Sequence, residues 1–181
     1  MGEIHIDLFT TLDGVAQAPG GRDEDREGGF EFGGWQAPLF DDLVHAEDGI
    51  DGSIAHVFNH VPKYVASRGT PALDWNGSQL LSPDVVGAVQ SLRERHESIH
   101  VIGSLDFVQT LLREQLFDRL NLWVYPVVLG QGKKVFQGGE VPTSLRLAEP
   151  AVTGPSGAVG LRYELASGLP QTGDMDSRGE N

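Results

Sequence analysis

Hydrophobic and polar residues alternate at the start of the chain. Ile4, Ile6 and Leu8 fall on one side of an extended segment, and His5 and Asp7 fall on the other. A period of two residues is typical of a strand with one buried face. The pattern therefore predicts a first strand that runs on through Phe9, followed by a turn.

Continuous apolar runs predict further strands. Residues 99–102 and 120–129 have no regular polar interruption, which is typical of strands that are buried on both faces. Residues 63–67 read as a short strand. Residues 145–165 predict a hairpin whose turn lies at 153–157, where Gly and Pro are concentrated. We expect residues 4–9, 99–102 and 120–129 to be the most buried strands.

Apolar residues at helical spacing predict the helices. Ser82 is a candidate N-cap with Pro83 in the first helical turn, and Val85 to Leu92 follow at helical spacing. A helix over residues 105–116 would turn Val108, Leu111 and Leu112 inward. Residues 35–45 predict a short helix.

Strands and helices alternate along the chain, which predicts an α/β fold with helices on both faces of the sheet. The closing antiparallel hairpin makes the sheet mixed. The loop over residues 16–34 is long enough to suggest a function. We expect one domain over residues 1–166 and a disordered tail over 167–181, because the tail is polar and contains few large apolar residues.

Composition narrows the function classes. The 181 residues carry a net charge of −13 and no cysteine. The acidic surface disfavours nucleic-acid binding, and the missing thiols exclude disulfides, thiolate metal sites and cysteine nucleophiles. No apolar run reaches the roughly 18–20 residues of a membrane span. With no secretory signal, the expected location is the cytoplasm.

The junction at Gly103 and Ser104 is a candidate anion site. It joins a predicted strand to a predicted helix, whose first turn presents unpaired N–H groups to a phosphate. The alternative is a tight turn at Gly103 and a helix cap at Ser104. Asp106 lies close by, so its carboxylate must point away or weaken the binding of an anion.

Two other groups of residues could bind ligands. Ser67 and Arg68 follow a predicted strand, where the arginine could hold a phosphate or be an ordinary surface residue. His56 and His60 are four residues apart, but no third ligand accompanies them, so we expect no metal site. The acidic residues within 23–27 are expected to form a solvated surface rather than a calcium site.

Several segments together resemble the reductase domain of riboflavin biosynthesis, in the dihydrofolate-reductase-like superfamily. These segments are Tyr125-Pro-Val-Val-Leu-Gly-Gln-Gly-Lys-Lys-Val-Phe136, Thr11-Leu-Asp-Gly-Val15, Pro62-Lys-Tyr-Val-Ala-Ser-Arg68 and the Gly-rich loop over residues 28–38. Their order and spacing along residues 3–165 are more specific than any one segment. The resemblance implies a dihydrofolate-reductase-like fold and reduction of a small pterin or aminopyrimidine-like heterocycle with NADPH.

The resemblance also assigns roles to residues. It implies cofactor binding by Thr11, Asp13, Gly14, Ser67, Arg68, Gly103, Ser104 and Leu105. Trp35 and Phe40 would contact the substrate, although Trp35 could instead anchor a core. The proton would come from water or from Asp13. A homodimer is implied, through the sheet edge or through the strand around Trp123 and Tyr125.

One family segment is missing. Relatives place a strand ending in a Gly-Arg-x-Thr-Tyr type of motif, and a helix, between the Trp35 region and the Lys63 strand. Residues 46–61 contain no Gly-Arg pair, and Gly49 and Gly52 interrupt any strand there. A second hypothesis is therefore a non-catalytic, dimeric ligand-binding relative that has lost part of its cofactor site. A third is a shortened chain that folds poorly.

Overall fold

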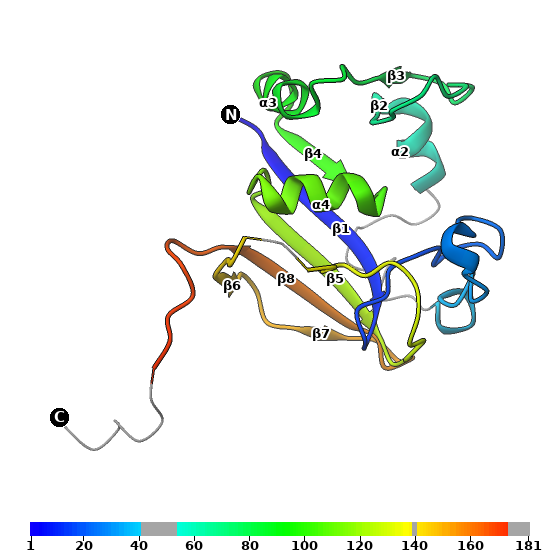
Figure 1. Ribbon diagram of the computed structural model, residues 1–181, viewed down its shortest axis with the longest axis vertical. Coiled ribbons are helices and arrows are strands. Elements are labelled where there is room, and N and C mark those ends of the chain that lie inside the picture. Colours follow the sequence, from blue (N-terminus) through cyan, green and yellow to red (C-terminus); the bar gives the residue numbers. More distant parts are fainter. Residues whose placement is uncertain (41–53, 139–140, 174–181) are drawn as a thin grey trace.

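The central element is a mixed β-sheet with β1 in its interior (Figure 1). The computed structural model describes residues 1–40, 54–138 and 141–173. Strand β1 pairs in parallel with β4 and β5, and β8 continues the sheet in the antiparallel sense. The sheet has the order β4-β1-β5-β8-β6, and β7 pairs with β8. Its strands are β1 (Glu3–Thr11), β4 (Ser98–Val101), β5 (Arg119–Tyr125), β6 (Leu145–Leu147), β7 (Val152–Thr153) and β8 (Val159–Leu165).

The remaining elements lie around this sheet. Two short strands form a separate parallel pair, which the sequence analysis predicted only in part because it missed β3. Three α-helices and two 3₁₀ turns complete the described chain. These elements are η1 (Glu27–Gly29), η2 (Ala37–Leu39), α2 (Ile54–His60), β2 (Lys63–Val65), β3 (Ser78–Leu80), α3 (Val85–Arg95) and α4 (Leu105–Arg113).

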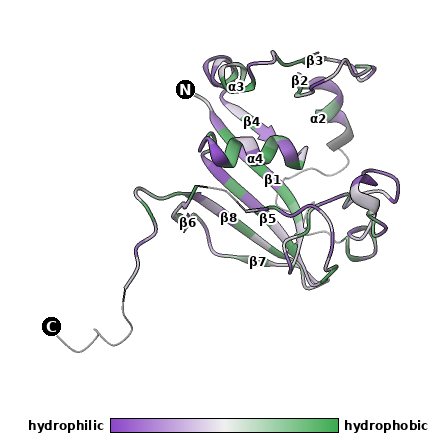
Figure 2. Ribbon diagram, in the orientation of Figure 1, coloured by the Kyte–Doolittle hydropathy of each residue, from purple (hydrophilic) through white to green (hydrophobic). Residues whose placement is uncertain are grey.

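The main core lies on the face of β1 that carries Ile4, Ile6 and Leu8. These side chains are 0%, 0% and 4% exposed, and they cluster with Val108 and Leu111 of α4. Figure 2 shows green apolar segments on both α4 and β1. The period of two in β1 and the helical spacing in α4 thus produce one shared buried layer.

Among the described helices, α3 and α4 pack on this face, and no described residue of α2 belongs to either core cluster. Val89 of α3 belongs to the same core cluster as α4. On the opposite face, the described residues that cover the sheet come from the loop after β1, including Phe30 and Trp35. They pack on Trp123 and Tyr125 of β5, which are 8% and 0% exposed. The loop therefore contributes to a second layer on this face.

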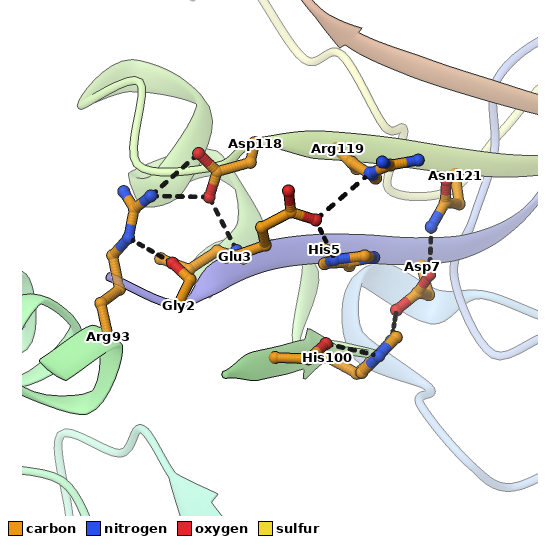
Figure 3. A network of polar contacts seen from close by, with 11 residues as sticks. Gly2, Glu3, His5, Asp7, Arg93, His100, Asp118, Arg119 and Asn121 are labelled. Atoms are coloured by element: carbon orange, nitrogen blue, oxygen red, sulfur yellow. Dashed lines mark hydrogen bonds and ion pairs between the residues drawn. The ribbon is translucent and has the colours of Figure 1, made fainter. Parts of the chain in front are cut away.

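A charged clamp holds the N-terminus in place (Figure 3). The Arg93 guanidinium bonds both carboxylate oxygens of Asp118 at 2.8 Å and donates to the Gly2 carbonyl at 3.0 Å. Asp118 in turn accepts from the Ile4 N–H at 2.8 Å. A Cβ on Gly2 would lie 1.8 Å from the His96 carbonyl oxygen, so only glycine fits this position.

Several predicted boundaries are wrong for identifiable reasons. Strand β5 ends at Tyr125 rather than at residue 129, because Pro126 has no N–H for the ladder. Strand β4 is the last strand of the sheet in the described part of the chain and Ile102 is 63% exposed, so residues 99–102 are not among the most buried. The N-cap of α3 is Asp84, whose side chain accepts from the Gly87 N–H, rather than Ser82.

The predicted helix over residues 35–45 is reduced, in its described part, to η2. Phe40 has an extended backbone that ends this turn, and residues 41–45 lie outside the described residues. The hairpin prediction is confirmed, with the Gly154 N–H bonded to the Ala158 carbonyl across its turn. Ala166 is bonded to the Ser144 carbonyl, and no helix or strand follows in residues 167–173. The rest of the predicted disordered tail, residues 174–181, lies outside the described residues.

The outer edge of β4 has no paired strand in the described part of the chain. The Glu3 N–H donates to the Glu97 carbonyl at 2.9 Å. This bond determines which residues of β4 turn their peptide groups toward β1 and which turn them away. Residues 97, 99 and 101 therefore turn their peptide groups toward β1, and those of Ser98 and His100 face the edge.

In these same described ranges, no helix is long and apolar enough to cross a membrane.

Truncating Ile6 tests the burial of β1. Ile6→Ala removes a fully buried side chain and should lower the free energy of unfolding by about 2–5 kcal/mol. Ile102→Ala is the matched control, because Ile102 is 63% exposed and should change stability by less than about 0.5 kcal/mol. Urea unfolding followed by circular dichroism measures both. Equal losses would contradict the core described above.

Candidate functional site

The C-terminal ends of three parallel strands point toward the same edge of the sheet, although β4 ends level with Ile6 and β1 and β5 end further on, at Thr11 and Tyr125. Strand β1 ends before a turn at residues 12–14, β4 before Gly103, and β5 before a loop that begins at Pro126. In open α/β sheets the carboxyl ends of the strands are where ligands bind. This edge is therefore the candidate site, and its residues are taken in turn below.

Gly103 and Ser104 form an exposed corner between β4 and α4. Gly103 has φ +147°, a backbone conformation that favours glycine, and a Cβ there would meet nothing within 4 Å. The peptide bond between Gly103 and Ser104 is cis. Open space beside an exposed glycine gives an incoming group room to approach the backbone closely.

Ser104 is the N-cap residue of α4, but its side chain makes no capping hydrogen bond. The Ser104 side chain therefore does not have the capping role that was the alternative to anion binding. The side chain of Leu105 is 8% exposed and belongs to the core, so only its backbone faces the corner. Asp106 is exposed in the first turn of α4, where its charge opposes an anion.

Thr11, Asp13 and Gly14 form a tight turn whose polar groups bond to one another and to the β5 loop. The Thr11 hydroxyl donates to Asp13 Oδ1 at 2.6 Å and accepts from the Val15 N–H at 2.9 Å. Asp13 also accepts from the N–H groups of Leu129 and Gly130, at 3.2 and 2.8 Å. The carboxylate of Asp13 therefore joins the ends of β1 and β5.

These hydrogen bonds set the charge of Asp13. The Thr11 hydroxyl is the largest influence, and with the Gly130 and Leu129 N–H groups it outweighs desolvation and lowers the pKa of Asp13 to about 2. A carboxyl group with this pKa is ionised at neutral pH. Asp13 thus has no proton to give to a substrate, and its contacts are those of a structural anchor.

Ser67 and Arg68 lie beyond the end of β2, which pairs with β3 and not with the main sheet. The Ser67 hydroxyl accepts from the Gly69 N–H at 3.1 Å, and Arg68 is exposed. Gly103 follows a strand of the central sheet, whereas Ser67 and Arg68 follow a strand of the separate pair. The two halves of the predicted cofactor site are therefore not joined by a common sheet.

The predicted substrate residues occupy different environments. Trp35 is 8% exposed, its indole N–H donates to the Gln17 carbonyl at 2.9 Å, and its ring meets Tyr125 edge-on at 5.8 Å. Trp35 is thus the core anchor that the sequence analysis kept as an alternative. Phe40 follows η2 and is 49% exposed.

The sequence analysis missed the residues that fasten the long loop. Lys133 Nζ bonds Asp25 Oδ2 at 2.8 Å and Glu27 Oε2 at 2.6 Å, while Gln17 accepts from the Lys133 N–H at 2.9 Å. Burial alone would lower the pKa of Lys133, but the two acidic partners outweigh it and raise that pKa. Lys133 lies more than 100 residues from Asp25 and Glu27 in the sequence, so no local pattern predicts that they pair. The only local sign was the group of acidic residues in the loop.

Two cavities lie away from this edge of the sheet, and the described ranges contain no group of side chains arranged to bind a metal ion. One cavity of about 270 Å³ adjoins the N-terminal clamp, and an apolar one of about 310 Å³ lies between Leu112 and Leu145. Neither includes a residue of the candidate site. Within residues 1–40, 54–138 and 141–173, no three His, Asp or Glu side chains are grouped to hold a metal ion.

Comparisons with known proteins fit this geometry. A model of the family described as the RibD C-terminal domain matches residues 59–157. A search of curated proteins finds no match. Solved structures share the fold, including a putative riboflavin biosynthesis protein from Shewanella sp. PV-4. It is 15% identical with a TM-score of 0.65, and the match covers 92% of this chain and 99% of that one.

Two other solved structures extend the likeness. A pyrimidine reductase-like protein from Corynebacterium diphtheriae is 14% identical with a TM-score of 0.58, over 91% of this chain and 92% of that one. The Thermotoga maritima diaminohydroxyphosphoribosylaminopyrimidine deaminase/5-amino-6-(5-phosphoribosylamino)uracil reductase is 14% identical with a TM-score of 0.57. That match covers 91% of this chain and 57% of the larger protein. The dihydrofolate-reductase-like fold predicted from the sequence is confirmed.

Removing the charge of Asp13 tests its role as an anchor. Asp13→Asn should lower the free energy of unfolding at neutral pH by about 1–2 kcal/mol, because two backbone N–H groups lose a charged acceptor. The folded pKa lies below the ordinary 3.8, so the difference should be complete above that pH and disappear as the pH falls toward 2.

Thermal or urea unfolding at several pH values measures this difference. Asp23→Asn is the control, because the Asp23 side chain is 75% exposed and pairs only with Arg26 among its described contacts. A loss of stability at pH 7 that is equally large in both variants would contradict the anchor role.

Proposed function

This chain belongs to the RibD C-terminal domain family, and we propose that it is an NADPH-dependent reductase of a small heterocycle, of the pterin or aminopyrimidine class. The observation that carries the proposal is the exposed Gly103–Ser104 corner at the carboxyl end of β4, in a chain with this family membership. The reductase named among the similar structures, from Thermotoga maritima, gives the comparison for the reaction.

The corner fits the phosphate part of a dinucleotide. Gly103 has open space where a side chain would stand, the first turn of α4 presents its N–H groups, and the Ser104 hydroxyl makes no capping bond. Gly103, Ser104 and the Leu105 backbone would hold a phosphate there, and Ser67 and Arg68 would add a hydroxyl and a cation. When bound, NADPH supplies the hydride.

The proposal gives the β1 turn a supporting role. Asp13 holds this turn against the β5 loop, so Thr11 and Gly14 shape the edge of the site rather than donate to a ligand. With Asp13 ionised, the proton that accompanies the hydride comes from water. Phe40, which is half exposed, is the better candidate than the buried Trp35 for contact with a flat substrate ring.

A second function has one specific observation in its favour. The outer edge of β4 has no partner strand in the described chain, and β2 and β3 pair apart from the main sheet. Residues 46–61 also lack the Gly-Arg motif of relatives. This is the arrangement expected of a non-catalytic relative that retains the fold and binds a ligand without reducing it.

Binding and turnover separate the two functions. The reductase should bind NADPH in a calorimetric titration and gain thermal stability from it, and it should oxidise NADPH when a suitable pterin or aminopyrimidine is added. Binding without oxidation across such a substrate panel would favour the second function. No binding of NADPH or NADH at millimolar concentration would contradict the cofactor site itself.

We also propose that the chain forms a homodimer through a sheet edge. The family resemblance implies a dimer interface either at a sheet edge or around Trp123 and Tyr125. Both of these side chains are buried within the chain, so they are unsuited to an interface. Strand β4 is the last strand of the sheet in the described part of the chain, so its outer edge is the candidate for pairing with a second chain. Light scattering at micromolar concentration should give twice the chain mass of 19.5 kDa. A single-chain mass would contradict the dimer.

Substitutions at Gly103 provide the sharpest test of the cofactor corner. Gly103→Asp should abolish NADPH binding, because a carboxylate would occupy the space meant for a phosphate. Gly103→Ala is the matched control, because it adds the same strain at φ +147° without the charge. Ser104→Ala should weaken binding by about 1 kcal/mol. Equal binding by the Asp and Ala variants, measured by calorimetry, would contradict a phosphate at this corner.

A further inference from the structure

A polar patch lies on the face of the sheet opposite α4. It consists of side chains from three neighbouring strands, Glu3, His5, Asp7, Ser98, His100, Arg119 and Asn121 (Figure 3). His100 is the third residue of β4 and lies three residues before Gly103, so the patch begins close to the candidate cofactor corner. None of its residues is among those assigned to that corner.

Three of its side chains form a hydrogen-bonded series. The Ser98 hydroxyl lies 3.0 Å from His100 Nε2, and His100 Nδ1 lies 2.8 Å from Asp7 Oδ2. The second carboxylate oxygen, Asp7 Oδ1, accepts from Asn121 Nδ2 at 2.7 Å. Serine, imidazole and carboxylate thus contact one another in the order and through the atoms that activate a serine nucleophile.

The partners determine which ring nitrogen of His100 carries the proton. An ionised carboxylate can only accept a hydrogen bond, so Nδ1 donates to Asp7. In the neutral ring, Nε2 is then the acceptor for the Ser98 hydroxyl. This is the tautomer that a general base needs in order to take a proton from serine.

The sheet holds these groups in place. Ser98 and His100 are two residues apart on β4 and share a face, and His100 is paired with His5 on β1. The His5 ring packs against that of His100, with centroids 4.7 Å apart. Asn121 is 8% exposed and its Oδ1 has no hydrogen-bond partner among the described residues, so its bond to Asp7 is the one that secures its amide.

Exposure suits the three roles. The side chain of Asp7 is 13% exposed, as befits a group that orients the imidazole from within the protein. The His100 side chain is 58% exposed, and Ser98 is also open to solvent.

We propose that Ser98, His100 and Asp7 form a second active site that hydrolyses small, activated carboxylic esters. Ser98 Oγ attacks the ester carbonyl carbon as its proton passes to His100 Nε2. The bond to the leaving alcohol breaks, and the alcohol departs with that proton. Water then attacks the Ser98 ester, His100 takes and returns the proton, and the carboxylic acid leaves. Ester and water are consumed, and acid and alcohol are formed.

The open face determines the substrate class. Ser98 and His100 are both exposed, so the site surrounds little of a particular acyl chain and offers little binding energy for it. Esters with small acyl groups and good leaving groups need the least stabilisation at the transition state. Aryl acetates meet both conditions, and p-nitrophenyl acetate is the probe.

Ester hydrolysis by the full chain tests the proposal. The unmodified protein should release p-nitrophenolate and carry an acetyl group on Ser98, located by peptide mass spectrometry. Ser98→Ala should abolish this label, and His100→Ala should slow release on the order of 100-fold. Asp7→Asn should slow it comparably, because an amide donor at Nδ1 favours the wrong tautomer. Ser91→Ala is the control, since the Ser91 hydroxyl bonds a helix carbonyl and should not matter.

The absence of cysteine from the chain allows a second test that needs no turnover. Ser98→Cys places a single thiol beside His100, and Ser91→Cys places one on the surface of α3. At neutral pH iodoacetamide should alkylate the first on the order of 10-fold faster, because His100 promotes the thiolate. Adding His100→Ala to Ser98→Cys should remove the difference.

Several outcomes would overturn the proposal. Acetyl groups found only on lysine, histidine or the N-terminus would show ordinary surface acylation, as would equal rates for the unmodified protein and Ser98→Ala. Equal alkylation rates for the two cysteine variants would show that His100 does not activate its neighbour. Circular dichroism of each variant establishes that it is folded. None of these results depends on NADPH, so they are independent of the proposed reductase.

Discussion

Strand β1 must be paired along both edges and covered on both faces, and the rest of the molecule is arranged around that requirement. Its peptide groups bond to β4 on one side and β5 on the other. Its apolar face receives α4, and part of its other face receives the loop that carries Phe30 and Trp35. A buried peptide group without a partner costs free energy, so the two neighbours of β1 fix the sheet order. Both candidate sites follow from that order, because one includes residues of β4 and the other directly follows it.

The sequence predicted the parts of the fold in which periodicity and burial agree. Ile4, Ile6 and Leu8 alternate and are buried, and Val108, Leu111 and Leu112 have helical spacing and are buried. The prediction failed where a backbone property intervened, as at Pro126, which ends β5 although the side chains beyond it remain apolar. It also failed for β4, because an edge strand and a central strand can have the same few apolar residues.

The candidate sites were predictable to different degrees. Gly103 and Ser104 were identified because a glycine at a strand-to-helix corner is a local signal. Trp35 could not be assigned from the sequence, since its burial depends on Tyr125, which lies 90 residues away. The group of Ser98, His100 and Asp7 was not predicted for a similar reason. Asp7 meets His100 only through the parallel pairing of β1 with β4, and no local motif specifies that register.

The N-terminal clamp has a practical consequence for handling the protein. Met1 is 94% exposed and points into solvent, whereas Gly2 is enclosed by the His96 carbonyl and the Arg93 side chain. A purification tag can therefore be joined ahead of Met1 without meeting the folded body. A cloning site that changes the second codon cannot be accommodated, because any side chain there would push β1 away from the end of α3. The chain thus tolerates additions at its beginning but not replacement of its second residue.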